Sequence, residues 1–249
     1  MRCTLVYAYP PQAEKVASYR SPLRPGRTPK FVTLNFMSNY RNSALRLVRK
    51  VGPLPSLTRK RPGWRRSKTP GQHGRKLTDR KFLRDKSAYG LRLWEKQKLR
   101  FNYNINERQL VRYVRMAKRT STPTGDTLLG LLEMRLDNIV YRLGFSRTIV
   151  GARQLVNHGH IRVNGQKLTV PSYSCARKDE ISVGPHPKSR ELVNRVLKRG
   201  SRRQKRSYVP KHLSFNPETR VGVVERWASR REVRLNINPL LVVEYYSGC

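Results

Sequence analysis

The stretch SRTIVGARQLVNHGHIRVNG, residues 146–165, contains the strongest signals for local structure in this chain. Its first part repeats apolar residues at the three- and four-residue spacing of an amphipathic helix, which predicts a helix over residues 146–160. Ser146 or Thr148 is expected to cap the start of this helix, and Gly159 is expected to end it. The side chains predicted to face inward are Ile149, Ala152, Leu155 and Val156.

The second part of the stretch alternates apolar and polar residues and ends in Asn164-Gly165, a strong signal for a two-residue hairpin turn. Another strand is expected over residues 179–183, and a shorter helix before the stretch is expected to end at Gly144. We therefore predict an α+β module in which two helices pack on a short twisted β-sheet. The apolar stripe of the shorter helix consists of Leu136, Ile139, Val140 and Leu143.

The 249-residue chain carries 54 Lys and Arg but only 15 Asp and Glu, a formal net charge of +39. Such self-repulsion does not favour a compact fold, so the charge indicates a polyanionic partner rather than a solvated basic face. The sequence has no apolar run near the length of a membrane span and no signal-peptide core at its start. Nucleic acid is therefore favoured over an anionic membrane as the partner.

Charge and composition divide the chain into four expected parts. Residues 1–36 are rich in Pro, which predicts an irregular extension; the sequence does not decide whether it is ordered, removed or merely an upstream extension. Residues 37–132, with 25 basic and 5 acidic residues, are expected to form a basic helical RNA-binding lobe. Residues 133–183, with only 8 basic and 4 acidic residues, are expected to be the folded module. Residues 184–249 are expected to be a long irregular basic tail and a C-terminal strand that returns to the core; whether the tail at 188–211 follows RNA or stays mobile is left open.

Residues 106–119 are expected to form the clearest helix, with Asn106 as its N-cap. One face is apolar, and the opposite face carries four arginines at spacings of four, three and four residues. A solvated helix face usually mixes acidic residues into such a pattern, and this face does not. Because guanidinium groups match phosphate oxygens bidentately, phosphate contact is favoured over a solvated face. The four residues are Arg108, Arg112, Arg115 and Arg119.

Residues 57–76, LTRKRPGWRRSKTPGQHGRK, are rich in Lys, Arg, Pro and Gly. Such a segment cannot bury enough apolar surface to fold alone, so we expect it to order against phosphates. Trp64 within it would either stack on a base or ribose or anchor the loop on the core, and the sequence does not decide between these roles.

His158 and His160 lie where the predicted helix meets the predicted strand. A metal site is not favoured, because it needs three or four ligands and no Cys or acidic partner stands nearby at a fixed spacing. Contact with phosphate or base edges is favoured, and a structural capping role is the alternative. Cys3, Cys175 and Cys249 are far apart and form no Cys-x-x-Cys pair, so neither structural zinc nor a cofactor is expected.

In combination these segments resemble the ribosomal small-subunit protein S4 family, in its chloroplast form. Residues 134–183, MRLDNIVYRLGFSRTIVGARQLVNHGHIRVNGQKLTVPSYSCARKDEISV, resemble the S4-type RNA-binding module, which alone occurs in several RNA-binding proteins. MSNYRNSALRLVRKVGPLPSLTRKRP (37–62) resembles the chloroplast form specifically. The likeness covers nearly all of residues 37–249 and leaves out residues 1–36. The other segments that resemble the family are PGQHGRK (70–76), YGLRLWEKQKLRFNYNINERQL (89–110), TGDTLLGLLEMRLDN (124–138) and NINPLLVVEYYS (236–247).

The resemblance implies a non-enzymatic structural constituent of the small ribosomal subunit, located in the chloroplast. It implies direct binding of small-subunit ribosomal RNA at a helix junction in the five-prime domain, which nucleates assembly. It also implies a position beside neighbouring ribosomal proteins, near the channel through which messenger RNA enters. Neither a membrane nor a small-molecule substrate is expected as a partner. Zinc is not expected either, since the cysteine cluster of some bacterial members is missing.

The candidate RNA-binding residues come from the basic loop and the arginine face, and by resemblance from the second helix of the module. In the helical lobe they are Arg41, Arg46, Lys60, Arg61, Trp64, Arg65, Arg66, Lys68, Gln72, His73, Arg75, Lys76, Arg108, Arg112, Arg115 and Arg119. In the module they are Arg135, Arg142, Arg147, Arg153, Asn157, His158, His160 and Lys167.

Two other functions compete with this interpretation. Some pseudouridine synthases pair the module with a catalytic domain whose key aspartate lies in an Arg-Leu-Asp triplet, and Arg135-Leu136-Asp137 matches these letters. Here the triplet falls at the start of the module's own helix, where Asp ordinarily meets the helix dipole, and no strand-rich domain remains to build a pocket. The second alternative is an assembly factor that uses the same module transiently.

Overall fold

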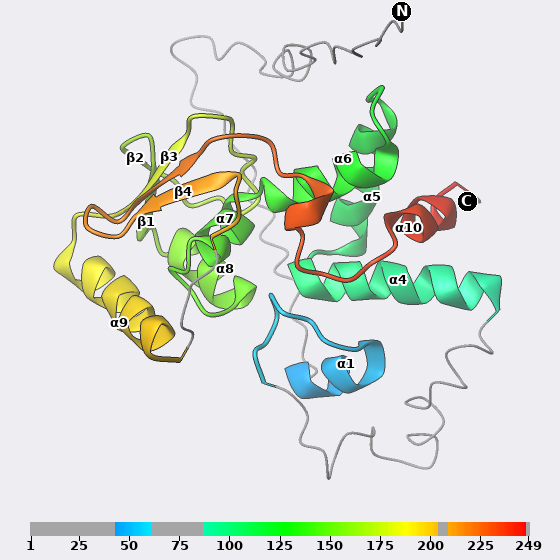
Figure 1. The fold of residues 1–249 in the computed structure, drawn as a ribbon, viewed down its shortest axis with the longest axis horizontal. Helices are drawn as coiled ribbons and strands as arrows, with labels where there is room; N and C mark the ends of the chain where they lie inside the picture. Colours follow the sequence, from blue (N-terminus) through cyan, green and yellow to red (C-terminus); the bar gives the residue numbers. More distant parts are fainter. Residues whose placement is uncertain (1–42, 61–86, 204–208, 248–249) are drawn as a thin grey trace, which may run out of the picture. The chain divides into compact units, whose positions relative to one another are not determined.

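The computed structural model describes residues 43–60, 87–203 and 209–247, which belong to one compact unit, Ser38–Cys249. These residues combine helices with a five-stranded antiparallel sheet, so the predicted α+β class is confirmed (Figure 1). The helices are α1 (Ala44–Val51), α4 (Ala88–Tyr103), α5 (Glu107–Lys118), α6 (Thr124–Glu133), α7 (Leu136–Arg142), α8 (Ile149–Asn157), α9 (Pro187–Arg203), the 3-10 helix η3 (Arg230–Glu232) and α10 (Pro239–Tyr245). The strands are β1 (Ile161–Val163), β2 (Gln166–Lys167), β3 (Glu180–Val183), β4 (Leu213–Asn216) and β5 (Val221–Val224).

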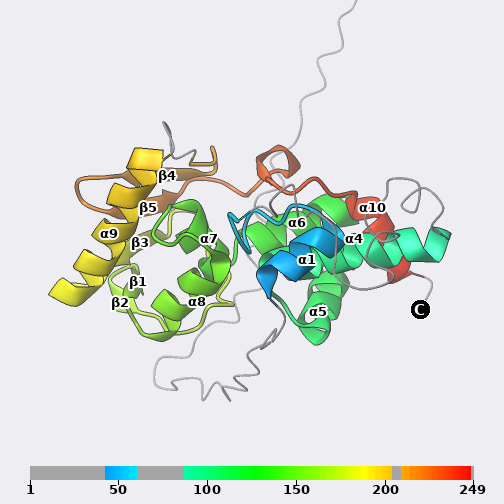
Figure 2. The same cartoon turned by 90° about the horizontal axis from the view of Figure 1, so that it is seen from below.

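A helical lobe is built from α1, α4, α5, α6 and α10, which share one hydrophobic core. Helix α10 lies alongside α4 in both views (Figures 1 and 2), and Arg92 of α4 pairs with Glu244 of α10 at 2.9 Å. The buried side chains of Leu235, Ile237 and Val242 come from the C-terminal segment. The end of the chain therefore completes the core of the lobe that its first described helix begins.

The second part of this unit is an α+β module, in which α7 and α8 share a hydrophobic core with a sheet of order β2-β1-β3-β5-β4. The hairpin turn between β1 and β2 is confirmed at Asn164 and Gly165, where φ is 50° and 78°. Both residues have the positive φ that a two-residue type I′ turn requires, which explains the Asn-Gly pair. Gly144 also ends α7 with φ of 83°, as expected.

The apolar stripes predicted for the two module helices supply most of the centre of a second core. Leu136, Ile139, Val140 and Leu143 of the first stripe are at most 1% exposed. In α8, Ala152 and Val156 are fully buried in this core and Leu155 packs against it, whereas the fully buried Ile149 belongs to the core of the helical lobe. The helical spacing of the sequence therefore predicted both stripes correctly.

The segment after the module differs from the expected irregular tail. Residues 187–203 form helix α9, which packs against β3. One C-terminal strand was expected to return to the core, and two are present, since β4 and β5 extend the sheet beyond β3. The last described element is not a strand but helix α10. This helix begins at Pro239, because Pro suits the first turn of a helix and the Asn238 side chain caps it by accepting from Leu240 N.

Candidate nucleic-acid interface

Helix α5 presents its four arginines to solvent, as the sequence predicts. Leu110, Val114 and Ala117 are at most 2% exposed and fix which side faces the core. The helix starts at the expected N-cap, where Asn106 N donates to Gln109 Oε1 at 3.2 Å. Within the described residues, none of the four arginines has a carboxylate partner; these exposed residues are Arg108, Arg112, Arg115 and Arg119.

The acidic residue of the same helix cannot neutralise this arginine face. The Glu107 carboxylate accepts from Lys96 Nζ at 3.0 Å and from the Tyr246 hydroxyl at 2.5 Å, and it lies 3.5 Å from Arg100 Nη1. Burial opposes ionisation of this group, but these donors lower the pKa of Glu107 below its ordinary value. The partners of Glu107 thus lie on α4 and in the C-terminal segment, and none of them belongs to the arginine face.

A second group of exposed basic side chains forms a corner where the C-terminal end of α8 meets β2, with His158 and Lys167. Arg147 is also exposed but lies at the opposite end of α8, before Thr148, which caps the helix by accepting from Gly151 N at 3.2 Å. Gly159 has φ of 72°, and a β-carbon there would collide with Lys167 Cε. Glycine thus lets the exposed Lys167 lie directly beside the end of the helix.

The two histidines at this corner have different environments. His158 is exposed, whereas His160 is partly buried and its Nδ1 lies 2.9 Å from Ser189 Oγ of α9. Burial first, and then the nearby His158, His186 and Lys167, lower the pKa of His160 below its ordinary value. No cluster that could hold a metal ion occurs among the described residues.

Three of the arginines expected to contact RNA form ion pairs with buried carboxylates, and two of the three, Arg135 and Arg142, are buried. Arg135 is 2% exposed and binds Asp137 through Nε and Nη2, at 3.1 and 2.8 Å, while its Nη1 donates to Tyr113 OH at 2.7 Å. Arg142 binds both oxygens of the buried Glu133, at 2.9 and 2.6 Å. These two residues are removed from the candidate surface because their donors are used by buried carboxylates.

Arg153 joins the module to the helical lobe. Its Nε donates to Asp137 Oδ2 at 2.8 Å, and its two terminal nitrogens donate to the backbone carbonyls of Tyr103 and Asn104, at the end of α4. Each of its three nitrogens thus has a partner in the protein, and because the side chain is still 14% exposed, contact of Arg153 with RNA stays a prediction. Its role in the structure is to hold the end of α4 against the start of α7.

Both buried carboxylates of this network are held ionised. Burial alone would raise the pKa of Asp137, but Arg135 and Arg153 lower it below its ordinary value. Burial likewise opposes ionisation of Glu133, and Arg142 lowers its pKa. Asp137 is 0% exposed, so a catalytic role for the Arg-Leu-Asp triplet has no access to a substrate. The expected position of this aspartate, in the first turn of α7, is confirmed.

The remaining candidates divide between exposed residues and residues outside the described ranges. Arg46 on α1 and Lys60 are exposed, and Asn157 at the end of α8 is half-buried. The rest of the basic loop, including Trp64, lies outside the described residues, as do Cys3 and Cys249, while Cys175 is buried. The candidates outside the described ranges are Arg41, Arg61, Trp64, Arg65, Arg66, Lys68, Gln72, His73, Arg75 and Lys76.

Sequence reasoning missed the basic helix α9, which carries exposed Lys188, Arg190, Arg195 and Lys198. A signal was present, because Val193, Val196 and Leu197 repeat at three- and four-residue spacing after Pro187. No helix among the described residues is long and apolar enough to cross a membrane.

The fold and the exposed cations define a basic protein of the RNA-binding class. Two family models match it: "Ribosomal protein S4/S9 N-terminal domain" over residues 39–133 and "S4 domain" over residues 134–181. The chain is 56% identical to small ribosomal subunit protein uS4c of Tupiella akineta, over 85% of this chain and 99% of that protein. It is 52% identical to uS4 of Thermosynechococcus vestitus and 49% identical to uS4c of Rhodomonas salina, in each case over 85% of this chain and 98% of the relative.

This chain therefore belongs to the ribosomal protein uS4 family, a family of small-subunit proteins. It is a structural protein and not an enzyme. Chloroplast uS4c proteins and cyanobacterial uS4 proteins are similar to it to nearly the same degree.

Proposed function

We propose that this chain binds small-subunit ribosomal RNA directly, at a helix junction in the five-prime domain, and nucleates assembly of a chloroplast small subunit. The observation that carries the proposal is the exposed arginine face of α5, which has no acidic partner within the described residues. Four like charges on one helix face repel one another, and phosphate oxygens along the face remove that repulsion. The relatives are named small ribosomal subunit proteins uS4 and uS4c, which supports small-subunit ribosomal RNA as the RNA that is bound.

The RNA would meet two surfaces of one body. The arginine face of α5 and the corner of His158 and Lys167 are both exposed and basic. Arg153 of α8 binds Asp137 of α7, which binds Arg135, and Arg135 donates to Tyr113 of α5, so hydrogen bonds connect the elements that carry the two surfaces. A rigid pair of basic surfaces would select RNA by shape, with phosphates supplying most of the affinity.

The test compares binding of the full chain to the five-prime domain of small-subunit ribosomal RNA and to an unrelated structured RNA of equal length. We expect a preference for the ribosomal RNA and a steep loss of affinity between about 0.1 and 0.5 M salt. Equal affinity for the two RNAs, or a shallow salt dependence, contradicts the proposal.

Sedimentation separates a resident protein from a transient assembly factor. A resident protein stays with washed small subunits at close to one copy each, whereas a factor is released. Recovery in ribosomes from purified chloroplasts is expected, in line with the similarity to uS4c proteins. Recovery only outside the organelle would contradict the proposed location. A place near the channel where messenger RNA enters, beside other ribosomal proteins, completes the proposal.

A further inference from the structure

Helix α9 (Pro187–Arg203) lies after both matched family segments, the second of which ends at residue 181. At a rise of about 1.5 Å per residue, its 17 residues make a rod about 25 Å long. Ser189 and Val193 are at most 4% exposed on its inner side, which packs against β3. The inner side is therefore committed to the module, and the outer side faces solvent (Figure 1).

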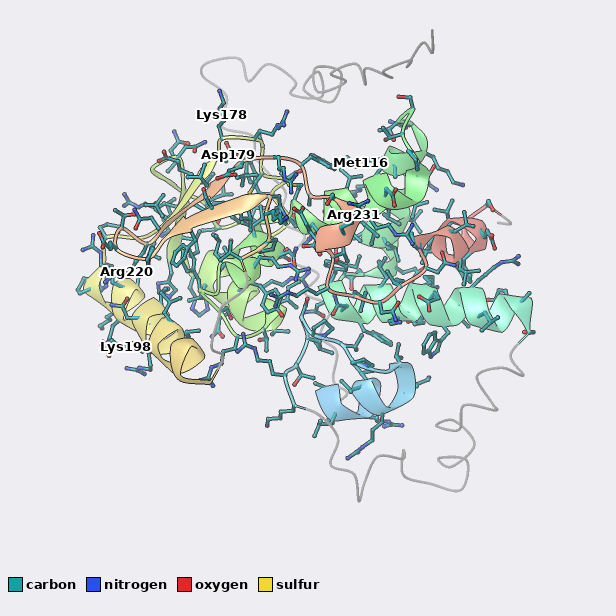
Figure 3. All side chains as sticks on the ribbon, in the orientation of Figure 1. Met116, Lys178, Asp179, Lys198, Arg220 and Arg231 are labelled. Carbon is teal, nitrogen blue, oxygen red and sulfur yellow. The ribbon has the colours of Figure 1, made fainter. Side chains whose placement is uncertain are left out.

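The outer side of α9 is strongly basic. Lys188, Arg190, Arg195 and Lys198 are exposed, and only Arg195 has a carboxylate partner among the described residues, Glu191 at 2.6 Å. Lys198 projects from α9 in the side-chain view (Figure 3). The helical backbone also includes Arg199, Arg202 and Arg203. Among the described residues, only Glu191 offsets part of this positive charge through an ion pair.

The start of α9 meets the corner already described at the end of α8. Ser189 Oγ lies 2.9 Å from His160 Nδ1, and His186 accepts from Lys188 N at 3.2 Å. His160 in turn stands beside His158, with ring centroids 5.9 Å apart. The basic corner therefore adjoins the start of the helix, where Lys188 and Arg190 are exposed, and the acidic residue next to them, Glu191, pairs with Arg195.

We propose that α9 is an additional RNA-binding element, which extends the corner surface and contacts backbone phosphates of the ribosomal RNA through Lys188, Arg190 and Lys198. This inference rests on the proposed function and deepens it. Phosphates are the matching ligand because the outer side offers flexible cations. Leu192, which is 40% exposed, is the large apolar residue that the described part of this side presents to solvent. An anionic membrane fits less well, because membrane-surface helices need an exposed apolar face and that face of α9 is buried against β3.

The test replaces Lys188, Arg190 and Lys198 with Gln in the full chain. A matched control replaces Arg177, Lys178 and Arg231, which are also exposed and lie on loops and η3, outside α9. Figure 3 labels Lys178 and Arg231. Both variants lose three positive charges, so a general charge effect changes them equally. Circular dichroism of both variants against the parent checks that each is folded.

We expect the α9 variant to bind five-prime-domain RNA at least tenfold more weakly near 0.15 M salt, and to reduce the salt slope by about three. The control variant is expected to change affinity less than threefold. Hydroxyl-radical footprints should show a patch of RNA protected by the parent and the control but not by the α9 variant.

Equal losses in the two variants, or an α9 variant that binds and protects RNA as the parent does, would overturn the inference. So would an α9 variant that binds RNA normally but fails to bind an acidic protein or anionic vesicles that the parent binds. If the parent itself shows no preference for ribosomal RNA, the proposed function fails, which is distinguishable from failure of α9 alone.

Discussion

The arginines of the module and the arginines of α5 belong to one chain but have opposite environments. Arg135 and Arg142 are at most 6% exposed and bind carboxylates that are fully buried. The four arginines of α5 are exposed and have no carboxylate partner in the part of the chain that the structure describes. A net charge of +39 therefore does not measure RNA-binding capacity, because some of the arginines form ion pairs inside the protein and stabilise the fold.

The largest expected effect comes from removing one buried carboxylate. Asp137→Asn leaves the buried Arg135 and the partly buried Arg153 without their carboxylate partner, so we expect a loss of about 3–5 kcal/mol in the free energy of unfolding. Urea unfolding followed by circular dichroism measures it. The matched control is Asp126→Asn, because Asp126 is exposed and its nearest described cation, Arg230, is 3.9 Å away. Similar stabilities for the two variants would show that the buried network does not hold the lobes together.

The α5 arginines are expected to show the converse behaviour. Replacing Arg108, Arg112, Arg115 and Arg119 with Gln should weaken binding to five-prime-domain RNA by about a hundredfold near 0.15 M salt, since about four phosphate contacts are lost. Stability should change by less than about 1 kcal/mol, because none of the four supports the fold through an ion pair within the described residues. Filter binding and urea unfolding of the same preparation measure the two effects.

A variant with Lys at the same four positions keeps the charge and loses the planar guanidinium group. We expect it to recover most of the salt-dependent affinity, with the remaining difference due to bidentate contacts. If the Gln variant binds as tightly as the parent, α5 is a solvated face and the main support for the proposed function is lost.

Much of this fold could be predicted from the sequence, and the failures have a common cause. Local rules found α5, α7, α8 and the Asn164-Gly165 turn, because caps, stripes and turn residues act over a few positions. The interior position of Arg135 was not predictable in this way. It precedes α7 as the N-cap residue, so its side chain can fold back onto Asp137 two residues later, which helical spacing does not allow.

The candidate site was predictable to a similar extent. Exposure of the α5 arginines follows from a stripe within the same helix, whereas partial burial of Arg153 depends on carbonyls of Tyr103 and Asn104, about fifty residues earlier in the chain. Helix α9 was missed because its run of Lys and Arg resembles a tail that needs RNA to order. Such long-range partners require the structure.

The pH dependence of stability should also separate the two groups of charges. The pKa values of Asp137 and Glu133 are lowered in the folded protein, so each carboxylate stabilises the fold fully above its unfolded pKa, about 4. This stabilisation is lost as the pH falls from about 5 through the lower folded pKa values. Urea unfolding at pH 5 and pH 3 should therefore show a fall in stability that is smaller in Asp137→Asn than in the parent. An equal fall in both proteins would show that Asp137 is not held ionised.

The smallest expected effect lies where the two groups of arginines meet. Tyr113 belongs to α5, between Arg112 and Arg115, yet its hydroxyl accepts from the buried Arg135 at 2.7 Å. Tyr113→Phe removes this acceptor, and because Tyr113 is only half-buried, water can replace part of the bond. We expect a loss of about 1 kcal/mol in stability and RNA affinity within twofold of the parent. In a double-mutant cycle with Asp137→Asn the two losses should not add, since both residues bind one guanidinium. A loss of RNA affinity in Tyr113→Phe without a loss of stability would mean that this residue belongs to the exposed surface and not to the buried network.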